Sequence, residues 1–426
     1  MRKMAATRSD KRNFWALVAE KAGFGFALSF AGPYTVLTAL AAQLTTSAIV
    51  IGSITTVWNG ALFLPVSFVA RWIRNHSERM PIIRRLFLGR ALAFPVVALW
   101  LFFTRAADPV LTLAVLIAGM LVFCLSDGAN SIPYIDMVAR IMDSKTRAKM
   151  TWQGLLLGGV LGIAGSFVVQ RVLTPGVMPF PVNFAFLLGL AGLIFFGAWL
   201  CICLVPERDV QAARHRAQVE GDAADRRGFV EILRHDRVFR RMLLTRLFTG
   251  ADQMAVPFYT VFGLTVLKLS PEMVGLFVGA QTIGALLAPI IYGWIAVNSG
   301  AHRVIQVGAL VQLSSPLIGV AVVVLGAVVP ALSPAIALAF VATGFSNSGM
   351  ALGYYNYPLD WCPDCDRPNY MALLSIVSAT SMLAPLIGGL VAQSFSYLAL
   401  YGFTALLVLL GAVIGVGLPD MRMRHT

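Results

Sequence analysis

Apolar stretches of about 20 residues follow one another almost without interruption along this chain. Because an α-helix rises about 1.5 Å per residue, a stretch of that length crosses the hydrocarbon core of a bilayer. The first stretch lacks a small-residue cleavage site, so we expect a retained helix and not a signal peptide. The pattern predicts an all-α integral membrane protein with twelve transmembrane helices, at residues 14–43, 47–70, 82–104, 109–135, 150–171, 182–205, 241–268, 272–297, 303–328, 333–358, 369–394 and 397–418.

The second half of the chain repeats the first. Residues 33–36 (PYTV) return about 224 positions later as 257–261 (PFYTV), and 165–170 (GSFVVQ) returns as 388–393 (GGLVAQ). Because six is an even number, two six-helix halves enter the membrane from the same side and form parallel repeats. The predicted organisation is an N-terminal six-helix half at 1–205, a hydrophilic cytoplasmic linker at 206–240 and a C-terminal six-helix half at 241–426.

Composition supports the membrane assignment and limits the partners. The chain is 58% hydrophobic and 12% charged, with a net charge of +13. Among the basic residues, only Arg105, Arg171 and Lys268 fall near the loops of one side, and most of the others fall near the opposite loops. This bias predicts that both termini are cytoplasmic, in a bacterial inner membrane. Because it also accounts for the net charge, we expect the lipid bilayer and no nucleic acid as a partner.

With twelve helices, cytoplasmic termini, a central linker and parallel halves, the chain resembles the major facilitator superfamily over essentially its full length. A loop signature of that family survives in weakened form at residues 293–303 (GWIAVNSGAHR), and the corresponding loop after the second span has Arg71, Arg74 and Arg79 without the Gly and Asp. The resemblance implies that the first, fourth, seventh and tenth helices surround a central cavity. It also implies that the second, fifth, eighth and eleventh helices form the contact between halves, and Gly154, Gly158 and Gly162 on the fifth favour close helix approach.

Charged and polar side chains inside these spans are the candidate site residues. An ionised group in the hydrocarbon costs several kcal/mol, so such groups usually face a water-filled cavity or a partner. The candidates for a proton or substrate site are Asp252, Asp127, Glu20, Lys21, Arg90, Asn347, Tyr354, Tyr355 and Asn356.

Each charged candidate also has a structural explanation. Arg90 lies at nearly the depth of Asp127, so the two can form a neutralised pair. Lys21 can extend toward the cytoplasmic surface and hold Glu20 near the headgroups. Asp252 either carries a proton, which would make the protein proton-coupled, or is a structural partner of Arg246 or of a backbone group.

An acidic loop with two cysteines follows the tenth span. The Cys-x-x-Cys pair with interleaved aspartates can ligate a divalent metal or an iron species, form a reversible disulfide, or be a solvated helix end. The candidate metal ligands are Asp360, Cys362, Asp364, Cys365 and Asp366.

The opening residues Met1-Arg2-Lys3, the length and the acidic cysteine loop also resemble the major facilitator proteins of the magnetosome membrane. That narrower resemblance implies iron as the cargo, the acidic loop as its cytoplasmic contact, and the magnetosome membrane as a location.

The sequence therefore predicts a secondary transporter that works by alternating access on a small solute or metal ion, as a monomer or weak oligomer. The cargo stays open between iron and small organic solutes or drugs exported by efflux, and a non-transporting membrane sensor or assembly platform is the other alternative. We expect no enzyme and no cofactor, because all five histidines fall in loops or tails and the sequence has no phosphate-binding loop, dinucleotide fingerprint or catalytic triad in a plausible context.

Overall fold

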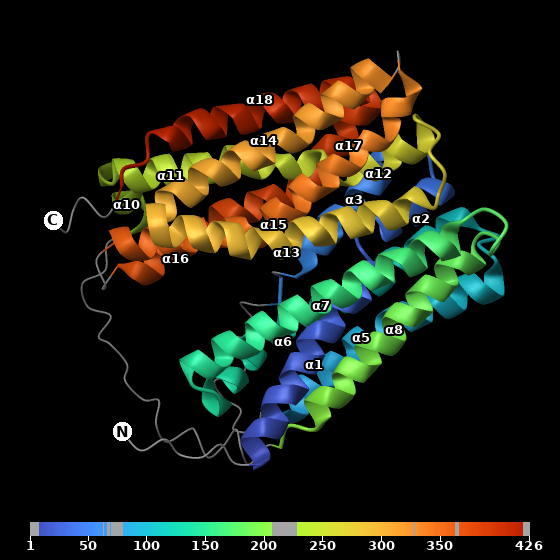
Figure 1. Cartoon of the computed structure of the whole chain (residues 1–426), viewed down its shortest axis with the longest axis horizontal. Coiled ribbons are helices and arrows are strands. Elements are labelled where there is room, and N and C mark those ends of the chain that lie inside the picture. Colours follow the sequence, from blue (N-terminus) through green and yellow to red (C-terminus); the bar gives the residue numbers. More distant parts are fainter. Residues whose placement is uncertain are drawn as a thin grey trace. The chain divides into compact units, whose positions relative to one another are not determined.

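The computed structural model describes residues 8–62, 64, 65, 69, 80–206, 228–326, 329–362 and 366–420. Every regular element in this part of the chain is helical (Figure 1). The chain forms two compact units: unit 1 comprises Met1–Leu44 with Val57–Glu220, and unit 2 comprises Thr45–Thr56 with Gly221–Thr426.

Unit 1 is a bundle in which α1 packs against α7 and α8, and α5 packs against α6 and α8 (Figure 1). Its helices are α1 (Arg8–Phe30), α2 (Val36–Leu44), the end of α3 (Ala48–Ala61), α5 (Met80–Thr104), α6 (Pro109–Ile141), α7 (Ser144–Leu173) and α8 (Val182–Cys203). The bundle therefore brings α1, α5 and α6, which carry the charged candidates of the first half, to one region.

Unit 2 is a second bundle, in which α15 packs between α13 and α14 and α18 packs against α11 and α14. Its helices, besides the start of α3, are α10 (Phe229–His235), α11 (Arg237–Thr249), η2 (Gly250–Met254), α12 (Val256–Thr265), α13 (Met273–Ser299), α14 (Ala301–Gly326), η3 (Pro330–Ile336), α15 (Ala337–Trp361), α16 (Arg367–Thr380), η4 (Ser381–Leu383), α17 (Ala384–Ser394) and α18 (Tyr397–Val416).

Nine helices in the described part are long and apolar enough to cross a membrane. The other three predicted spans correspond to α1 with α2, to α3 and to α11 with η2 and α12. The chain is therefore a multi-pass integral membrane protein, as the hydrophobic pattern predicts.

Several predicted spans are interrupted rather than continuous. The first is broken at residues 31–35, the seventh by the 3₁₀ segment η2 and the eleventh by η4. Pro33 lies within the first break, and Pro257 follows the break in the seventh span. Proline has no backbone N–H, so each removes one helical hydrogen bond. Such breaks leave backbone groups available inside a span, which a membrane tolerates only where protein or water contacts them.

Aspartates begin two long helices of unit 1. Asp108 accepts from the backbone N–H groups of Val110 and Leu111 at the start of α6, and Asp143 accepts from that of Thr146 at the start of α7. Hydrogen bonding to Thr146 lowers the pKa of the exposed Asp143 carboxyl below its usual range. Both caps satisfy N–H groups that have no partner within the helix.

Candidate functional site

Arg90 on α5 lies at the centre of an ion-pair network in unit 1. Its Nη1 donates to Asp127 Oδ1 at 2.8 Å, and its Nη2 donates to Glu20 Oε1 at 3.1 Å. The hydroxyl of Tyr134 donates to the other oxygen of Glu20 at 2.9 Å. The side chains of Arg90 and Glu20 are 4% and 6% exposed, whereas that of Asp127 is 24% exposed. The network therefore ties α1, α5 and α6 together and exposes mainly Asp127.

Aromatic rings surround the guanidinium of Arg90. Its Cζ lies 4.2 Å from the ring centre of Phe87, 5.0 Å from that of Phe24 and 5.5 Å from that of Phe195. The negative faces of such rings attract a cation that has little water around it. Three rings and two carboxylates thus hold Arg90 in one place.

The structure contains the Arg90–Asp127 pair that the similar depths of the two residues suggest. Glu20 is buried against Arg90, so its structural partner is Arg90 and not Lys21, while its role in a proton or substrate site stays a prediction. Depth along a helix fixes the level of a residue but not the face, and the face of α1 that carries Glu20 turns toward α5. The stem of Lys21 instead lies against Gly154 of α7.

A cavity of about 390 Å³ adjoins this network within unit 1. Its charged lining residues are Glu20, Lys21, Arg90 and Asp127, so the formal charges balance. One face of α6 supplies Asp127, Asn130, Ser131 and Tyr134, at helical spacings of three, four and seven residues. The sequence analysis missed the last three as site residues, although this spacing after Asp127 is a signal that could have found them.

Asp252 forms the centre of a second polar cluster, in unit 2. It lies in the 3₁₀ segment η2, is 3% exposed, and accepts from Gln312 Nε2 at 2.9 Å and from Gln253 Nε2 at 3.2 Å. Gln253 Nε2 also donates to Asn347 Oδ1 at 3.3 Å. The structure thus brings Asp252 and the candidate Asn347 into one cluster and adds two glutamines that the sequence analysis did not single out.

Arg246 does not form a direct ion pair with Asp252. Its Nε donates to Ser378 at 3.1 Å, and its guanidinium lies 5.4 Å from the ring centre of Tyr354, whose hydroxyl is 3.2 Å from that of Thr249. The ion pairs among the described residues do not include Asp252. Asp252 is therefore a buried carboxylate held by the neutral side-chain amides of Gln312 and Gln253, and it also accepts a backbone hydrogen bond from Gln253, as the backbone alternative predicts.

The tenth span divides its candidates between two faces. Tyr354 is buried in the contacts just described, whereas Tyr355 and Asn356 are exposed. Neighbouring positions on a helix point about 100° apart, so a run of polar residues in the sequence does not form one polar face.

The acidic cysteine loop lies partly outside the described residues, which include neither Asp364 nor Cys365, nor the side chain of Asp360. Cys362 is buried in an apolar cluster, and this burial raises the pKa of its thiol. Asp366 is also buried. In the part of the chain that the structure describes, no group of three or more His, Cys, Asp or Glu side chains is placed to hold a metal ion. The metal site in this loop therefore stays a prediction.

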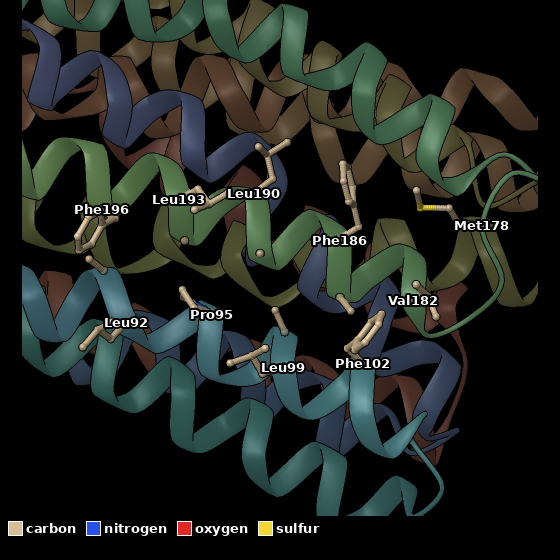
Figure 2. Close-up of a pocket in the computed structure, with 15 residues that line it drawn as sticks. Leu92, Pro95, Leu99, Phe102, Met178, Val182, Phe186, Leu190, Leu193 and Phe196 are labelled. Atoms are coloured by element: carbon tan, nitrogen blue, oxygen red, sulfur yellow. The ribbon is translucent and has the colours of Figure 1, made fainter.

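A larger hollow of about 550 Å³ lies between α5 and α8 of unit 1 (Figure 2). Only apolar residues and glycine line it, among them Pro95, Leu99, Phe186 and Leu193. Several of these side chains are exposed although they belong to membrane-spanning helices, which is typical of a surface that contacts lipid. Without a polar group to orient a solute, this hollow is a poor candidate for the functional site.

Comparisons with known proteins agree on the fold. The model of the Major Facilitator Superfamily matches residues 243–422. Among solved structures, a bacterial homologue of the iron transporter ferroportin in an inward-facing state has a TM-score of 0.68 at 15% identity, covering 97% of this chain and 99% of that one. The nucleoside transporter NupG has a TM-score of 0.70 at 11% identity, covering 96% and 100%. The D-xylose–proton symporter has a TM-score of 0.69 at 12% identity, covering 96% and 98%.

No curated protein matches the sequence. The structural matches extend over almost the whole of each chain, so this protein has the all-α major facilitator fold of integral membrane proteins.

Proposed function

We propose that the chain is a member of the major facilitator superfamily and a secondary transporter that works by alternating access with proton coupling. The observation that carries the proposal is Asp252, a carboxylate buried within a predicted span and held by neutral amides without an ion-pair partner among the described residues. A proton taken up by this group removes an uncompensated charge, and its release restores it. Cyclic protonation of this kind can drive a change of conformation.

Two separately compact units and a polar cavity in one of them support the transport assignment. Alternating access requires two halves that can rock as bodies about a site between repeats, and halves at 1–205 and 241–426 joined by a linker at 206–240 would provide them.

Iron is the leading cargo in this proposal. Its support is the similarity to a bacterial homologue of an iron transporter and the narrower resemblance to magnetosome-membrane proteins. The lining of the unit 1 cavity favours a second candidate, a small polar organic solute, because its two acidic and two basic side chains balance and aromatic rings are adjacent. Placement in the inner membrane or in a magnetosome membrane remains a prediction that the location of a tagged chain would test.

The test is uptake by proteoliposomes that contain the purified chain. We expect a pH gradient to drive accumulation of ferrous or ferric iron, and organic cations, sugars and peptides are assayed in parallel. Asp252→Asn should abolish gradient-driven accumulation and retain part of the exchange of cargo, because the neutral amide keeps the shape of the site but carries no proton. Asp143→Asn is the matched control, since asparagine also caps helices and Asp143 lies outside the spans.

Accumulation in Asp252→Asn with the pH dependence of the parent would exclude the proton role of Asp252. Failure of every cargo under either gradient direction would instead favour the sensor or assembly platform.

A further inference from the structure

We propose that Asp252, Gln253, Gln312 and Asn347 form a binding subsite for a hard divalent cation in unit 2. The inference rests on the proposed transport function and names the chemical class of its cargo. The four side chains come from η2, α14 and α15 and are linked by the hydrogen bonds from Gln312 and Gln253 to Asp252 and from Gln253 to Asn347.

Charge is the first argument. Asp252 is 3% exposed, and the ion pairs of the described residues leave its negative charge without a direct partner. The described cation whose charge acts on Asp252 is Arg246, which donates a hydrogen bond to Ser378 and lies over the ring of Tyr354. In unit 1, by contrast, Arg90 contacts both carboxylates directly. A mobile cation therefore gains more electrostatic attraction at Asp252 than at Glu20 or Asp127, with which Arg90 already forms ion pairs.

An oxygen atom without a partner is the second argument. Gln312 is 3% exposed, and its Oε1 is fully buried without a hydrogen-bond partner although its Nε2 donates to Asp252. A buried amide oxygen left without a hydrogen bond loses its contacts with water and gains nothing in return, so such atoms call for an explanation. Oε1 and Nε2 share one carbon, so this unpaired oxygen belongs to the same amide group that contacts Asp252, and a cation bound to that amide and the carboxylate would satisfy it.

The amides can change from donors to ligands without moving the backbone. The terminal torsion of glutamine is broad and roughly two-fold, so half a turn exchanges Nε2 and Oε1. In the structure the amides donate to the carboxylate, and after such a turn Gln312 and Gln253 would present oxygen to a cation that the carboxylate attracts. Asn347 is exposed and Gln253 partly exposed, so the cluster reaches from a buried carboxylate to an accessible amide.

The donor set determines the class of cation. One carboxylate and three amide oxygens, with water, suit hard divalent ions such as Mn²⁺, whereas soft ions prefer thiolate and thioether ligands. The subsite differs from the acidic cysteine loop in both its position and its ligands.

Binding of Mn²⁺ to the purified full-length chain in detergent, followed by the loss of the free-ion electron paramagnetic resonance signal, tests the subsite without transport. Gln312→Leu should weaken Mn²⁺ binding at least about tenfold, since loss of groups that only support ligands already costs about 10–100-fold. Gln312→Glu should tighten binding, because it supplies a second carboxylate. This second variant decides the question if Gln312→Leu does not fold.

Gln306→Leu is the matched control, because Gln306 lies on the same helix but donates to backbone carbonyls of residues 415 and 416. It should bind Mn²⁺ like the parent. Equal affinity in the parent, Gln312→Leu and Gln312→Glu would overturn the subsite. A parent that does not bind Mn²⁺ at millimolar concentration, yet accumulates an organic solute under a pH gradient, would overturn it while leaving the transport proposal intact.

Discussion

At the scale of single residues, Arg90 shows how unit 1 holds three charges in a membrane-spanning bundle. Removing charged groups from water costs several kcal/mol each, and direct pairing with additional hydrogen bonds offsets that cost. Here the hydroxyl of Tyr134 and three aromatic rings add to the two ion pairs. The network is therefore stable as a set and sensitive to the loss of any one member.

Replacement of Arg90 should expose that sensitivity. We expect Arg90→Gln to lower the free energy of unfolding by about 3–5 kcal/mol, because it leaves Glu20 and Asp127 as uncompensated charges. The double variant Arg90→Gln with Glu20→Gln should recover part of the lost free energy of unfolding, because it leaves only Asp127 as an uncompensated charge. Chemical unfolding in detergent measures both. Arg105→Gln is the control, because Arg105 is exposed in a loop. An equal loss in the control and in Arg90→Gln would refute the buried network.

The partners of these residues were only partly predictable. The depth of Arg90 and Asp127 along their helices suggests a pair, since both positions can be counted from the ends of apolar stretches. The same counting cannot reveal that Glu20 turns toward Arg90 or that Asp252 takes Gln312 instead of Arg246, because those contacts depend on helix rotation. For the cluster around Asp252, the signal in the sequence was a glutamine inside an apolar span, as at Gln253 and Gln312.

At the scale of helices, glycine sets the distance between α1 and α7. The sequence predicts a smooth face on α7, and in unit 1 this face packs against α1, where Gly25 and Gly158 meet. A Cβ on Gly158 would lie 3.0 Å from the carbonyl oxygen of Ala22 and 3.2 Å from its Cα. Since Gly25, Gly154 and Gly158 also line the charged cavity, this contact fixes one of its walls.

Alanine substitutions should distinguish glycines at close helix contacts from glycines with open space beside them. Gly158→Ala should destabilise the protein by about 1–3 kcal/mol, because the added methyl forces α1 and α7 apart. Gly197→Ala on α8 should instead stabilise it by about 0.5–1 kcal/mol through helix propensity, since nothing lies within 4 Å of the added atom. Thermal unfolding in detergent compares the two, and a stable Gly158→Ala variant would argue against the close contact.

The breaks within spans were harder to predict than the spans. Hydrophobicity reports that a segment is buried in lipid or protein but not whether its backbone is helical throughout. The breaks in the first and seventh predicted spans also lie at different positions of the repeat. The first lies at residues 31–35, whereas the second, η2, covers Gly250–Met254. Under the repeat of about 224 residues, Gly250–Met254 correspond to residues 26–30, which are part of α1. The local structure around Asp252 therefore differs from that of the corresponding residues in the first half.

At the scale of the whole molecule, the distribution of basic residues predicts an orientation. Arg105, Arg171 and Lys268 lie near loops of one side, and Arg140, Lys145, Lys149 and Arg303 lie near those of the other. Basic residues near the ends of spans are retained on the cytoplasmic side. With parallel repeats, the loop after α5 and the loop after α17 should both face away from the cytoplasm.

Thiol labelling of intact cells tests orientation and repeat together. Ala107→Cys, after α5, and Ser394→Cys, at the end of α17, should react with a membrane-impermeant maleimide added outside. Lys145→Cys and Arg303→Cys should react only after permeabilisation. The parent is the control and should not be labelled from outside. Its Cys124 is buried, and its other cysteines, Cys201, Cys203, Cys362 and Cys365, fall within predicted spans or on the predicted cytoplasmic side.

Reversal of all four results would mean that the chain is inverted, whereas labelling of Ala107→Cys and Ser394→Cys from opposite sides would mean that the halves are antiparallel. Only the second outcome contradicts the duplication argument, since two halves of six spans each must enter from the same side.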